Sequence, residues 1–181
     1  MAFYKDEKLA LFIDGANLYS AARGLALEID FRKLIDEFRK RGRLLRANYY
    51  TTLIETDEHN PIKPLVDWLS YNGFNTIVKT AREYVDRDGR KKVRGNMDVE
   101  LVTDMLELAP NLDHAVLFTG NGDFRRAVEA VKAKGVRVTV ISTVKSQPPM
   151  IGDELRREAD AFIDLDEMAD LIARPRRDGD D

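Results

Sequence analysis

The sequence contains no cysteine, so disulfide bonds, zinc–thiolate sites and thiol catalysis are all excluded. Histidine is nearly as scarce: His59 and His114 lie far apart in the chain, which argues against a histidine-based metal site. No apolar run approaches the length of a membrane span. The first apolar run, residues 9–13, follows acidic residues and is too short for a secretion signal. We therefore expect a cytoplasmic protein that does not enter a membrane.

The composition that is present is typical of a folded globular protein, with 181 residues of which 44% are hydrophobic and 34% charged. This length suffices for one α/β domain and is short for two. The formal net charge of −3 argues against a generally basic surface for nucleic acid. It leaves room for a local basic face, because a phosphate backbone responds to the local field as well as to the net charge.

Short apolar runs alternate with segments of helical spacing along the whole chain. We expect strands at residues 9–13, 44–53, 74–79, 115–118, 136–141 and 161–163. We expect helices at residues 31–41, 61–71, 97–108, 123–134, 153–157 and 166–172. This alternation predicts one α/β domain over residues 1–173, whose mostly parallel sheet has helices on both faces. Residues 174–181 form a charged tail.

The helix at residues 31–41 has the clearest boundaries. Asp30 is suited to cap its first turn, and Gly42 is suited to end it. The helix at residues 61–71 begins with a proline and stops before Gly73. A parallel sheet built from such units binds its ligands beyond the carboxyl ends of its strands, so we look for functional residues there.

Three short motifs place acids or amides at such positions. The first reads FIDGAN at residues 12–17, directly after the first strand. The second reads RGNMD at residues 94–98 and opens a helix, and the third reads TGNGDF at residues 119–124, directly after a later strand. If the sheet is wound as expected, the side chains that can meet at one rim are Asp14, Asp98, Asn121 and Asp123.

Each acid also has a purely structural interpretation. Asp14 followed by glycine could form a turn, and Asp98 and Asp123 could stabilise the positive ends of helices. Several carboxylates at strand ends, in a chain without other catalytic groups, favour a site instead. Clustered carboxylates repel one another, so they call for a cation. Mg²⁺ prefers oxygen ligands and could activate a water on a phosphodiester. Asn17 could orient a ligand, or simply begin the following helix.

A basic β-hairpin is expected at about residues 80–95, with its turn at Asp88 and Gly89. It leads directly into the motif that contains Asp98. Candidate phosphate contacts on the hairpin, and on the helix after Asp123, are Arg82, Arg90, Lys91, Lys92, Arg94, Arg125 and Arg126. The alternative is a hairpin whose charges only face solvent.

Three tyrosines near these motifs could stack on bases, as aromatic residues do in proteins that bind single-stranded nucleic acid. They are Tyr19, Tyr49 and Tyr84. Simple packing in the fold is the more common use of such residues.

Taken together, the three motifs resemble the NYN domain family, specifically its LabA-like branch within the PIN-like nuclease group. Two later segments, KGVRV at residues 134–138 and ADAFID at residues 159–164, also look like that branch. The resemblance extends over about residues 9–172. It implies a Rossmann-like, PIN-like three-layer domain with an acidic metal pocket and ribonuclease activity.

The resemblance also assigns roles to individual residues. Asp14, Asp98, Asp123 and the position of Asn121 would hold the metal and carry catalysis. Asn17 and Thr119 would support them. Asp104 matches a family acid, but it lies six residues beyond Asp98, so a regular helix turns it to another face. We expect it to act in support.

Asn121 departs from the family pattern, because the third motif usually reads Gly-Asp-x-Asp. Asparagine has nearly the shape of aspartate, but it is neutral and cannot take a proton from water as a carboxylate can. Metal affinity or the general-base step is thereby weakened. The chain is either a naturally weakened variant or an engineered inactive form.

We therefore expect a ribonuclease that uses Mg²⁺ or Mn²⁺ to hydrolyse phosphodiester bonds of single-stranded RNA. The first alternative is a catalytically silent RNA-binding or regulatory module. The second is another metal-dependent phosphotransferase or a phosphatase. A phosphatase with an aspartyl nucleophile would want Asp-x-Asp after the first strand, whereas here Asp14 is followed by Gly15 and Ala16. No phosphate-binding loop or dinucleotide fingerprint follows that strand.

Overall fold

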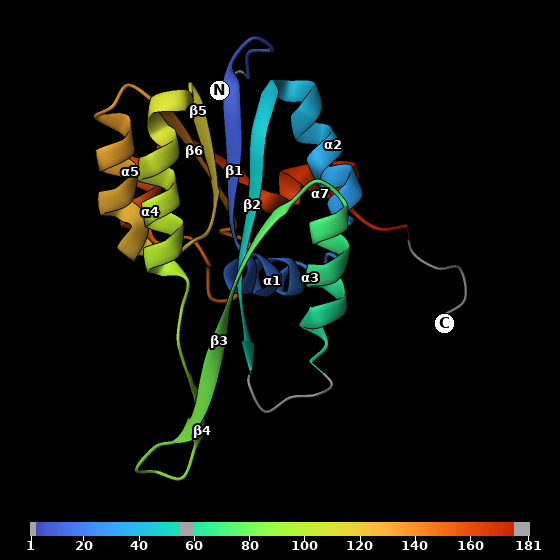
Figure 1. Cartoon of the computed structure of the whole chain (residues 1–181), viewed down its shortest axis with the longest axis vertical. Helices are drawn as coiled ribbons and strands as arrows, with labels where there is room; N and C mark the ends of the chain where they lie inside the picture. The colour runs from blue at the N-terminus through green and yellow to red at the C-terminus, as the bar shows by residue number, and fades with distance from the viewer. Residues whose placement is uncertain (1–2, 55–59, 176–181) are drawn as a thin grey trace.

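The computed structural model describes residues 3–54 and 60–175, and at its centre lies a seven-stranded sheet (Figure 1). Its strands are β1 (Lys8–Asp14), β2 (Arg43–Ile54), β3 (Asn75–Val85), β4 (Lys91–Arg94), β5 (His114–Phe118), β6 (Arg137–Ser142) and β7 (Ala161–Asp164). Their order across the sheet is β4-β3-β2-β1-β5-β6-β7. All neighbours run parallel except β3 and β4, which pair antiparallel. The expected mostly parallel α/β sheet is confirmed.

The chain changes direction at the middle of this sheet. From β1 it adds β2 and then β3 on one side, and afterwards it returns to add β5, β6 and β7 on the other. Neighbouring loops therefore diverge at the carboxyl ends of β1 and β5. Such a switch point is where open α/β sheets leave room for a ligand.

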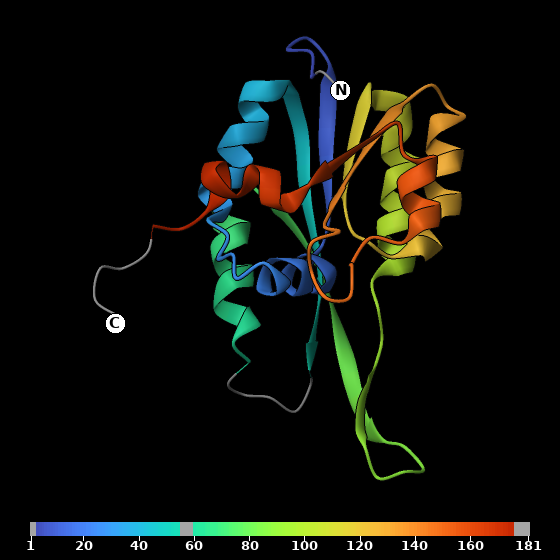
Figure 2. The same ribbon diagram turned by 180° about the vertical axis from the view of Figure 1, so that it is seen from behind.

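Helices cover both faces of the sheet (Figures 1 and 2). The α-helices are α1 (Gly15–Gly24), α2 (Phe31–Arg41), α3 (Ile62–Tyr71), α4 (Asp98–Leu108), α5 (Arg125–Lys132), α6 (Asp153–Glu158) and α7 (Ala169–Ile172). Short 3₁₀ helices are η1 (Ala109–Asn111), η2 (Gly122–Phe124) and η3 (Leu165–Met168). One core packs α1, α2, α3 and α7 on the sheet, and the other packs α4, α5 and α6. The result is a three-layer domain.

Strand β1 separates the two cores. Its residues Leu9 and Leu11 lie in the core with α1 and α2, whereas Ala10 and Phe12 lie in the core with α4 and α5. All four are fully buried. A strand covered on both faces reads as a continuous apolar run, which is why this segment stood out in the sequence.

The boundaries of α2 agree with the sequence. Asp30 accepts hydrogen bonds from the backbone N–H groups of Arg32 and Lys33, at 2.9 and 3.1 Å, and so caps the helix. Gly42 follows the last residue of the helix. Two other expected helices are divided, because 3₁₀ turns precede them: η2 comes before α5, and η3 before α7.

The hairpin differs from the expectation in one respect. The expected strand at residues 74–79 does not end there but runs to Val85, so the first arm of the hairpin is the end of β3. The turn is as expected: Asp86 donates to the carbonyl of Arg90 at 3.0 Å, and Gly89 has a left-handed φ of 76°. The hairpin projects beyond the sheet's carboxyl edge (Figure 1).

The first residue of the expected tail, Arg174, contacts the domain. Arg174 donates a side-chain hydrogen bond to Glu28 at 2.9 Å, and residues 176–181 of the expected tail lie outside the described residues. Over residues 3–54 and 60–175, no helix combines the length and the apolar character needed to cross a membrane.

Candidate active site

A cleft of about 460 Å³ opens at the carboxyl edge of the sheet and receives side chains from all three motifs. Its lining residues are Asp14, Ala16, Asn17, Ser20, Tyr50, Thr51, Thr52, Gly95, Asn96, Met97, Asp98, Asn121, Asp123 and Met150. The structure therefore brings together the four side chains that the sequence placed at one rim, Asp14, Asp98, Asn121 and Asp123. It does so beside the switch point between β1 and β5. Asn17 lines the same cleft.

Asp14 ends β1 and caps α1, where its Oδ1 accepts the backbone N–H of Asn17 at 3.4 Å. Its Oδ2 accepts a hydrogen bond from the hydroxyl group of Thr119 at 3.1 Å. Gly15 permits this placement, because a Cβ there would lie 2.7 Å from the ring of Tyr49 and from the carbonyl of Tyr50. Asp14 is thus both a helix cap, as its structural interpretation required, and part of the cleft.

Asn17 links the first motif to the third. Its side-chain oxygen accepts the backbone N–H of Gly120 at 2.9 Å. Gly120 has no room for a side chain, because a Cβ there would lie 2.0 Å from the carbonyl oxygen of Met150. The loop after β5 is therefore fixed from two sides, and Asn17 is a positioning residue for it.

Asn121 caps the short helix η2. Its Oδ1 accepts the backbone N–H of Asp123 at 3.0 Å, and its own N–H donates to the hydroxyl of Thr119 at 3.3 Å. Thr119 is buried and so connects Asp14 with Asn121. Aspartate would cap as well as asparagine does, so the neutral side chain is not required by the local fold.

Asp98 begins α4 on the opposite wall of the cleft. Its backbone N–H donates to the side-chain oxygen of Asn96 at 3.2 Å. Gly95 precedes this turn with a φ of 132°, a conformation that side chains other than glycine rarely adopt. The carboxylate of Asp98 is half-buried and lies at the helix's positive end.

Burial and like charge act on the same carboxylates. Burial raises the pKa of Asp14, and the charge of Asp98 raises it further, while hydrogen bonds from Thr119 and Asn17 oppose the shift. Burial also raises the pKa of Asp98, with further contributions from Asp123 and Glu100. The described residues that line the cleft include no lysine, arginine or histidine. The negative charge is therefore not compensated within the cleft.

The oxygen atoms in the cleft are of the type that a hard cation prefers, but they do not supply a complete set of ligands for one ion. Carboxylates and the carbonyl oxygen of Asn121 are the ligands that Mg²⁺ and Mn²⁺ accept. Yet, in residues 3–54 and 60–175, no three acids or histidines lie close enough to hold one ion together. Asp14, Asp98 and Asp123 thus line one cleft without being grouped as three ligands of a single ion. Mg²⁺ commonly binds one or two carboxylates and completes its shell with water.

Asp104 lies away from the cleft, on the α4 face expected from its spacing. Its Oδ2 accepts a hydrogen bond from the hydroxyl of Tyr50 at 2.8 Å, and that hydroxyl also accepts from Asn48 at 3.0 Å. Burial and the hydrogen bond to Asp104 raise the pKa of Tyr50, and the hydrogen bond from Asn48 opposes the shift. Asp104 thus contacts a residue of the cleft lining, Tyr50, without lining the cleft itself.

The candidate phosphate contacts on the hairpin and on α5 do not line the cleft. Arg82, Lys92 and Arg94 lie on the exposed hairpin, where Lys92 pairs with Asp86 at 3.1 Å. The guanidinium of Arg94 lies over the ring of Tyr84, 5.4 Å from its centroid. The remaining candidates, Arg90, Lys91, Arg125 and Arg126, are all exposed.

Four polar cleft residues were not predicted: Ser20, Thr51, Thr52 and Asn96. The two threonines stand near the carboxyl end of β2, so the rule that pointed to Asp14 applied to them too. Ser20 could be found only by knowing which face α1 turns to the cleft.

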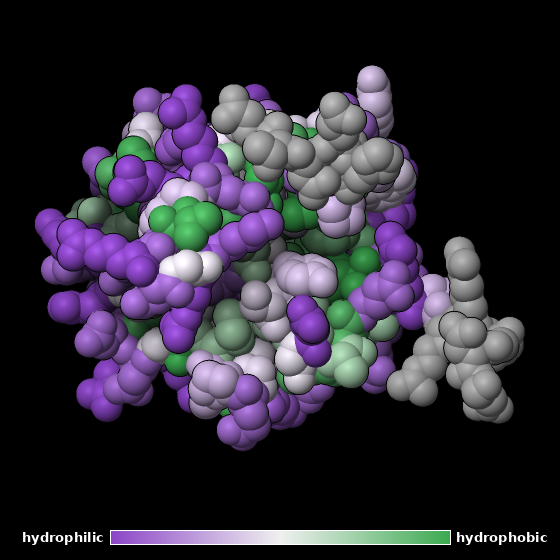
Figure 3. Space-filling model, turned by 90° about the horizontal axis from the view of Figure 1, so that it is seen from below, coloured by the Kyte–Doolittle hydropathy of each residue, from purple (hydrophilic) through white to green (hydrophobic). Residues whose placement is uncertain are grey.

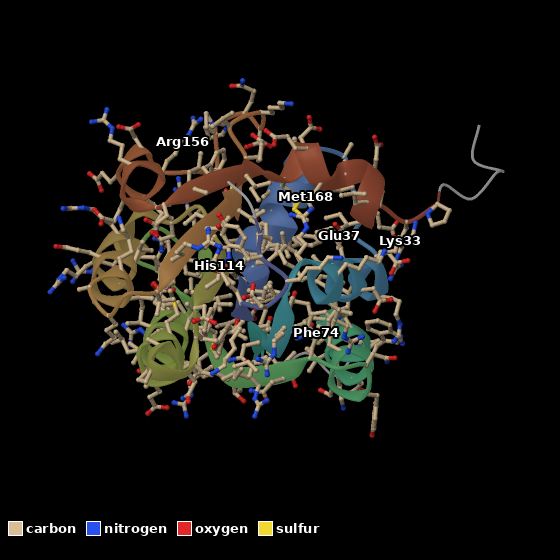
Figure 4. All side chains as sticks on the ribbon, turned by 90° about the horizontal axis from the view of Figure 1, so that it is seen from above. Lys33, Glu37, Phe74, His114, Arg156 and Met168 are labelled. Carbon is tan, nitrogen blue, oxygen red and sulfur yellow. The ribbon has the colours of Figure 1, made fainter. Side chains whose placement is uncertain are left out.

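His114 lies at the opposite edge of the sheet, seen from above in Figure 4. It is fully buried and shares a hydrogen bond of 2.7 Å with the hydroxyl of Thr139. Burial, with the charge of Arg137, lowers its pKa to about 4. His59 lies outside the described residues. His114 does not line the cleft.

Comparison with known proteins gives one family. The sequence model of the NYN domain matches residues 8–166. The chain is similar to the Low amplitude and bright protein LabA of Synechococcus elongatus, at 34% identity over 98% of this chain and 93% of that protein. It is also similar to the uncharacterized protein MJ0482 of Methanocaldococcus jannaschii, at 25% identity over 92% of this chain and 58% of that protein.

The fold is also found among solved structures. One of them is the protein of unknown function VPA0982 from Vibrio parahaemolyticus, with a TM-score of 0.73 and 24% identity, covering 95% of this chain and 99% of that one.

Proposed function

Because the chain belongs to the NYN domain family, we propose that it is a metal-dependent ribonuclease that hydrolyses RNA phosphodiester bonds at the acidic cleft. The observation that carries the proposal is the set of uncompensated carboxylates at the switch point of the sheet. Perturbed carboxylates in a cleft are a mark of function, since a fold gains nothing from burying repelling charges.

The bound ion would be Mg²⁺ or Mn²⁺, held by Asp14 and Asp98 and by water, with Asn121 and Asp123 in the same cleft. Such an ion activates a water and stabilises the leaving oxygen of the phosphodiester. Thr119 fixes the orientation of Asp14 through its 3.1 Å hydrogen bond. Asp123, which lines the same cleft, would take the proton of the attacking water.

Asn121 supports the alternative of a catalytically silent RNA-binding module. Its side chain offers a neutral oxygen where the family pattern has a carboxylate. That oxygen already accepts the N–H of Asp123. The cleft therefore carries one negative charge fewer than the family pattern, and metal affinity is weaker for it.

We infer that RNA reaches the cleft along the hairpin. The exposed cations of the hairpin stand beside the second motif, because Arg94 directly precedes Gly95 of the cleft lining. Replacing Arg90, Lys91 and Lys92 with alanine should weaken binding and reduce its dependence on salt, since each phosphate contact adds to the salt slope. Fluorescence anisotropy over a salt series measures both. An unchanged slope would leave the hairpin facing only solvent.

The experiment that tests the proposed activity is a cleavage assay on a panel of labelled RNAs, single-stranded and duplex, with Mg²⁺, Mn²⁺ or EDTA. We expect cleavage of single strands that requires metal and stops in EDTA. Binding without cleavage under every metal condition, by the native chain and by Asn121→Asp, would establish the silent module instead.

A further inference from the structure

A second hollow of about 710 Å³ lies on the other side of helix α1 from the acidic cleft. We call it the α1–α3 groove. Its walls are mainly aromatic and aliphatic, and Leu18, Tyr19, Phe31, Tyr49 and Leu65 form much of its lining. Figure 3 views this end of the molecule, where hydrophobic surface (green) is visible on the side of α3. The volume lies in the range of pockets that take small organic groups.

Two arginines give the rim of the groove a positive character. Arg23 and Arg174 both line it, and Arg174 is held in place by Glu28 at 2.9 Å. Tyr19 presents an exposed ring, with 66% of its surface accessible. Aromatic faces bordered by arginine are the combination that binds unpaired bases and the phosphates beside them.

Tyr49 adds a polar group inside the groove. The residue is only 4% exposed, and burial followed by the charge of Asp14 raises the pKa of its hydroxyl to about 12. Among the described residues, no hydrogen bond to this hydroxyl is found, although its ring packs on Phe31 and lies close to Gly15. The hydroxyl is not among the fully buried oxygen atoms that lack a partner, so it opens to the groove, where it can hydrogen-bond to a ligand or to water.

The groove and the acidic cleft share one wall. Helix α1 turns Asn17 and Ser20 toward the cleft, and Tyr19 and Arg23 toward the groove. Only the thickness of one helix, about 10 Å, separates the two. A strand held by its phosphate in the cleft can therefore place a neighbouring nucleotide in the groove.

We propose that the α1–α3 groove binds an unpaired nucleobase of the RNA strand whose phosphate lies in the acidic cleft. Tyr19 stacks on the base, the hydroxyl of Tyr49 hydrogen-bonds to its edge, and Arg23 contacts the adjoining phosphate. The inference rests on the proposed function and deepens it. A base can enter the groove only when it is unpaired, so the site itself selects single-stranded RNA.

The test is equilibrium binding in Ca²⁺ instead of Mg²⁺ or Mn²⁺, so that a cation can still bridge the phosphate and the acidic cleft while the catalytic ion is absent. Fluorescein-labelled oligouridine and oligoadenosine are compared with an abasic oligomer of the same length. We expect Tyr19→Ala to weaken binding of the base-bearing oligomers about fivefold or more, as the loss of one stacking contact does. Binding of the abasic oligomer should not change. Tyr71→Ala is the matched control, because Tyr71 is 88% exposed on α3 and does not line the groove.

Tyr49→Phe separates a ligand contact from a structural one. The variant loses only the hydroxyl, so we expect an unchanged or slightly higher melting temperature. We expect binding of base-bearing oligomers to weaken about two- to tenfold, the net effect of one hydrogen bond. A lower melting temperature with unchanged affinity would overturn the role given to this hydroxyl.

The failure of this proposal can be told from the failure of the proposed function. Cleavage with no preference for base-bearing RNA, equal in Tyr19→Ala and Tyr71→Ala, overturns the groove and leaves the nuclease. Base-dependent binding without cleavage supports the groove and overturns the nuclease. If Tyr19→Ala instead abolishes self-association in sedimentation and RNA affinity stays the same, the groove is a contact between copies, and the proposal is wrong.

Discussion

The two edges of the central sheet both gather charged side chains, yet they arrange them in opposite ways. The amino edge of β5 and β6 contains the buried ring of His114 (Figure 4). Beside this ring, Arg137 pairs with Glu7. At the carboxyl edge, Asp14 and Asp98 face each other across a cleft whose described lining carries no cation. The first edge satisfies its charges within the chain, and the second does not.

This difference shows how the two clusters should be understood. A paired charge next to a neutral histidine holds strands together, with Phe3 stacked on His114 at 4.8 Å as a cover. Unpaired carboxylates with raised pKa values weaken the fold unless something outside the chain binds them. A charged cluster therefore points to function when its charge is left uncompensated, and to stability when it is paired.

The largest effect is expected from removing one charge at the carboxyl edge. Asp14→Asn should lower RNA cleavage by about a thousandfold, since the site loses a metal ligand. Its melting temperature in EDTA should not fall, because the single side-chain oxygen of asparagine still caps α1, and the loss of the acceptor for Thr119 is offset by the removal of a buried, repelled charge. Cleavage rates and thermal melts of the purified variant measure both.

The matched control is Asp30→Asn, which makes the same change at the cap of α2, where Asp30 accepts from two N–H groups. It should keep full cleavage activity. If the two variants lose activity equally, the contrast between the edges is broken.

The next effect concerns pH at the amino edge. The pKa of His114 falls from 6.5 to about 4 in the fold, so the unfolded chain binds the proton more readily. Stability is complete above pH 6.5 and decreases as the pH falls toward 4, by on the order of 3 kcal/mol in total. Denaturant unfolding across this window measures the loss, and His114→Gln should show a flatter profile. Equal slopes in both proteins would contradict the assignment.

The carboxyl edge should respond to acid with the opposite sign. The pKa values of Asp14 and Asp98 are raised in the fold, so protonation favours the folded state. Between each raised value and about 3.8, falling pH recovers stability. In this lower window, the free energy of unfolding of Asp14→Asn should depend less on pH than that of the native chain.

A smaller effect is expected from restoring the family carboxylate with Asn121→Asp. The change keeps the cap of η2 and adds an anionic ligand. Metal affinity and cleavage should therefore rise about tenfold, because a charged oxygen replaces a neutral one beside the cation. In EDTA the variant should melt lower, because like charges repel, and added metal should reverse the difference. If neither turnover nor the metal response changes, residue 121 lies outside the functional site.

Much of the fold could be predicted from local signals. The α2 boundaries followed from Asp30 and Gly42, and the buried strand β1 from its continuous apolar run. The end of β3 could not be predicted, because beyond Lys79 every residue of the strand except Ala81 is exposed, and the segment lacks the alternation that a half-buried strand shows. Exposure of both faces to solvent removes the alternation of apolar and polar residues, but it does not prevent the strand from forming.

The cleft was predictable to the same extent. Asp14, Asp98, Asn121 and Asp123 stood at strand ends or helix starts, and the topology brings those positions to one edge. The groove beside α1 was not predictable, since it depends on how α1 packs against α3, which follows a different strand. The pairing of Asp104 with Tyr50 also needed tertiary geometry, because 54 residues separate the two.

The measurement that tests the central contrast most directly is a calorimetric titration of the native chain with Mn²⁺, at a series of decreasing pH values, in two buffers of different ionisation enthalpy. We predict binding that releases protons, because the cation displaces them from carboxylates whose pKa values are raised. Asp14→Asn should bind far more weakly, and Asp30→Asn should bind like the native chain. Absence of binding by the native chain and by Asn121→Asp alike, or equal binding by Asp14→Asn, would contradict a metal site at the carboxyl edge.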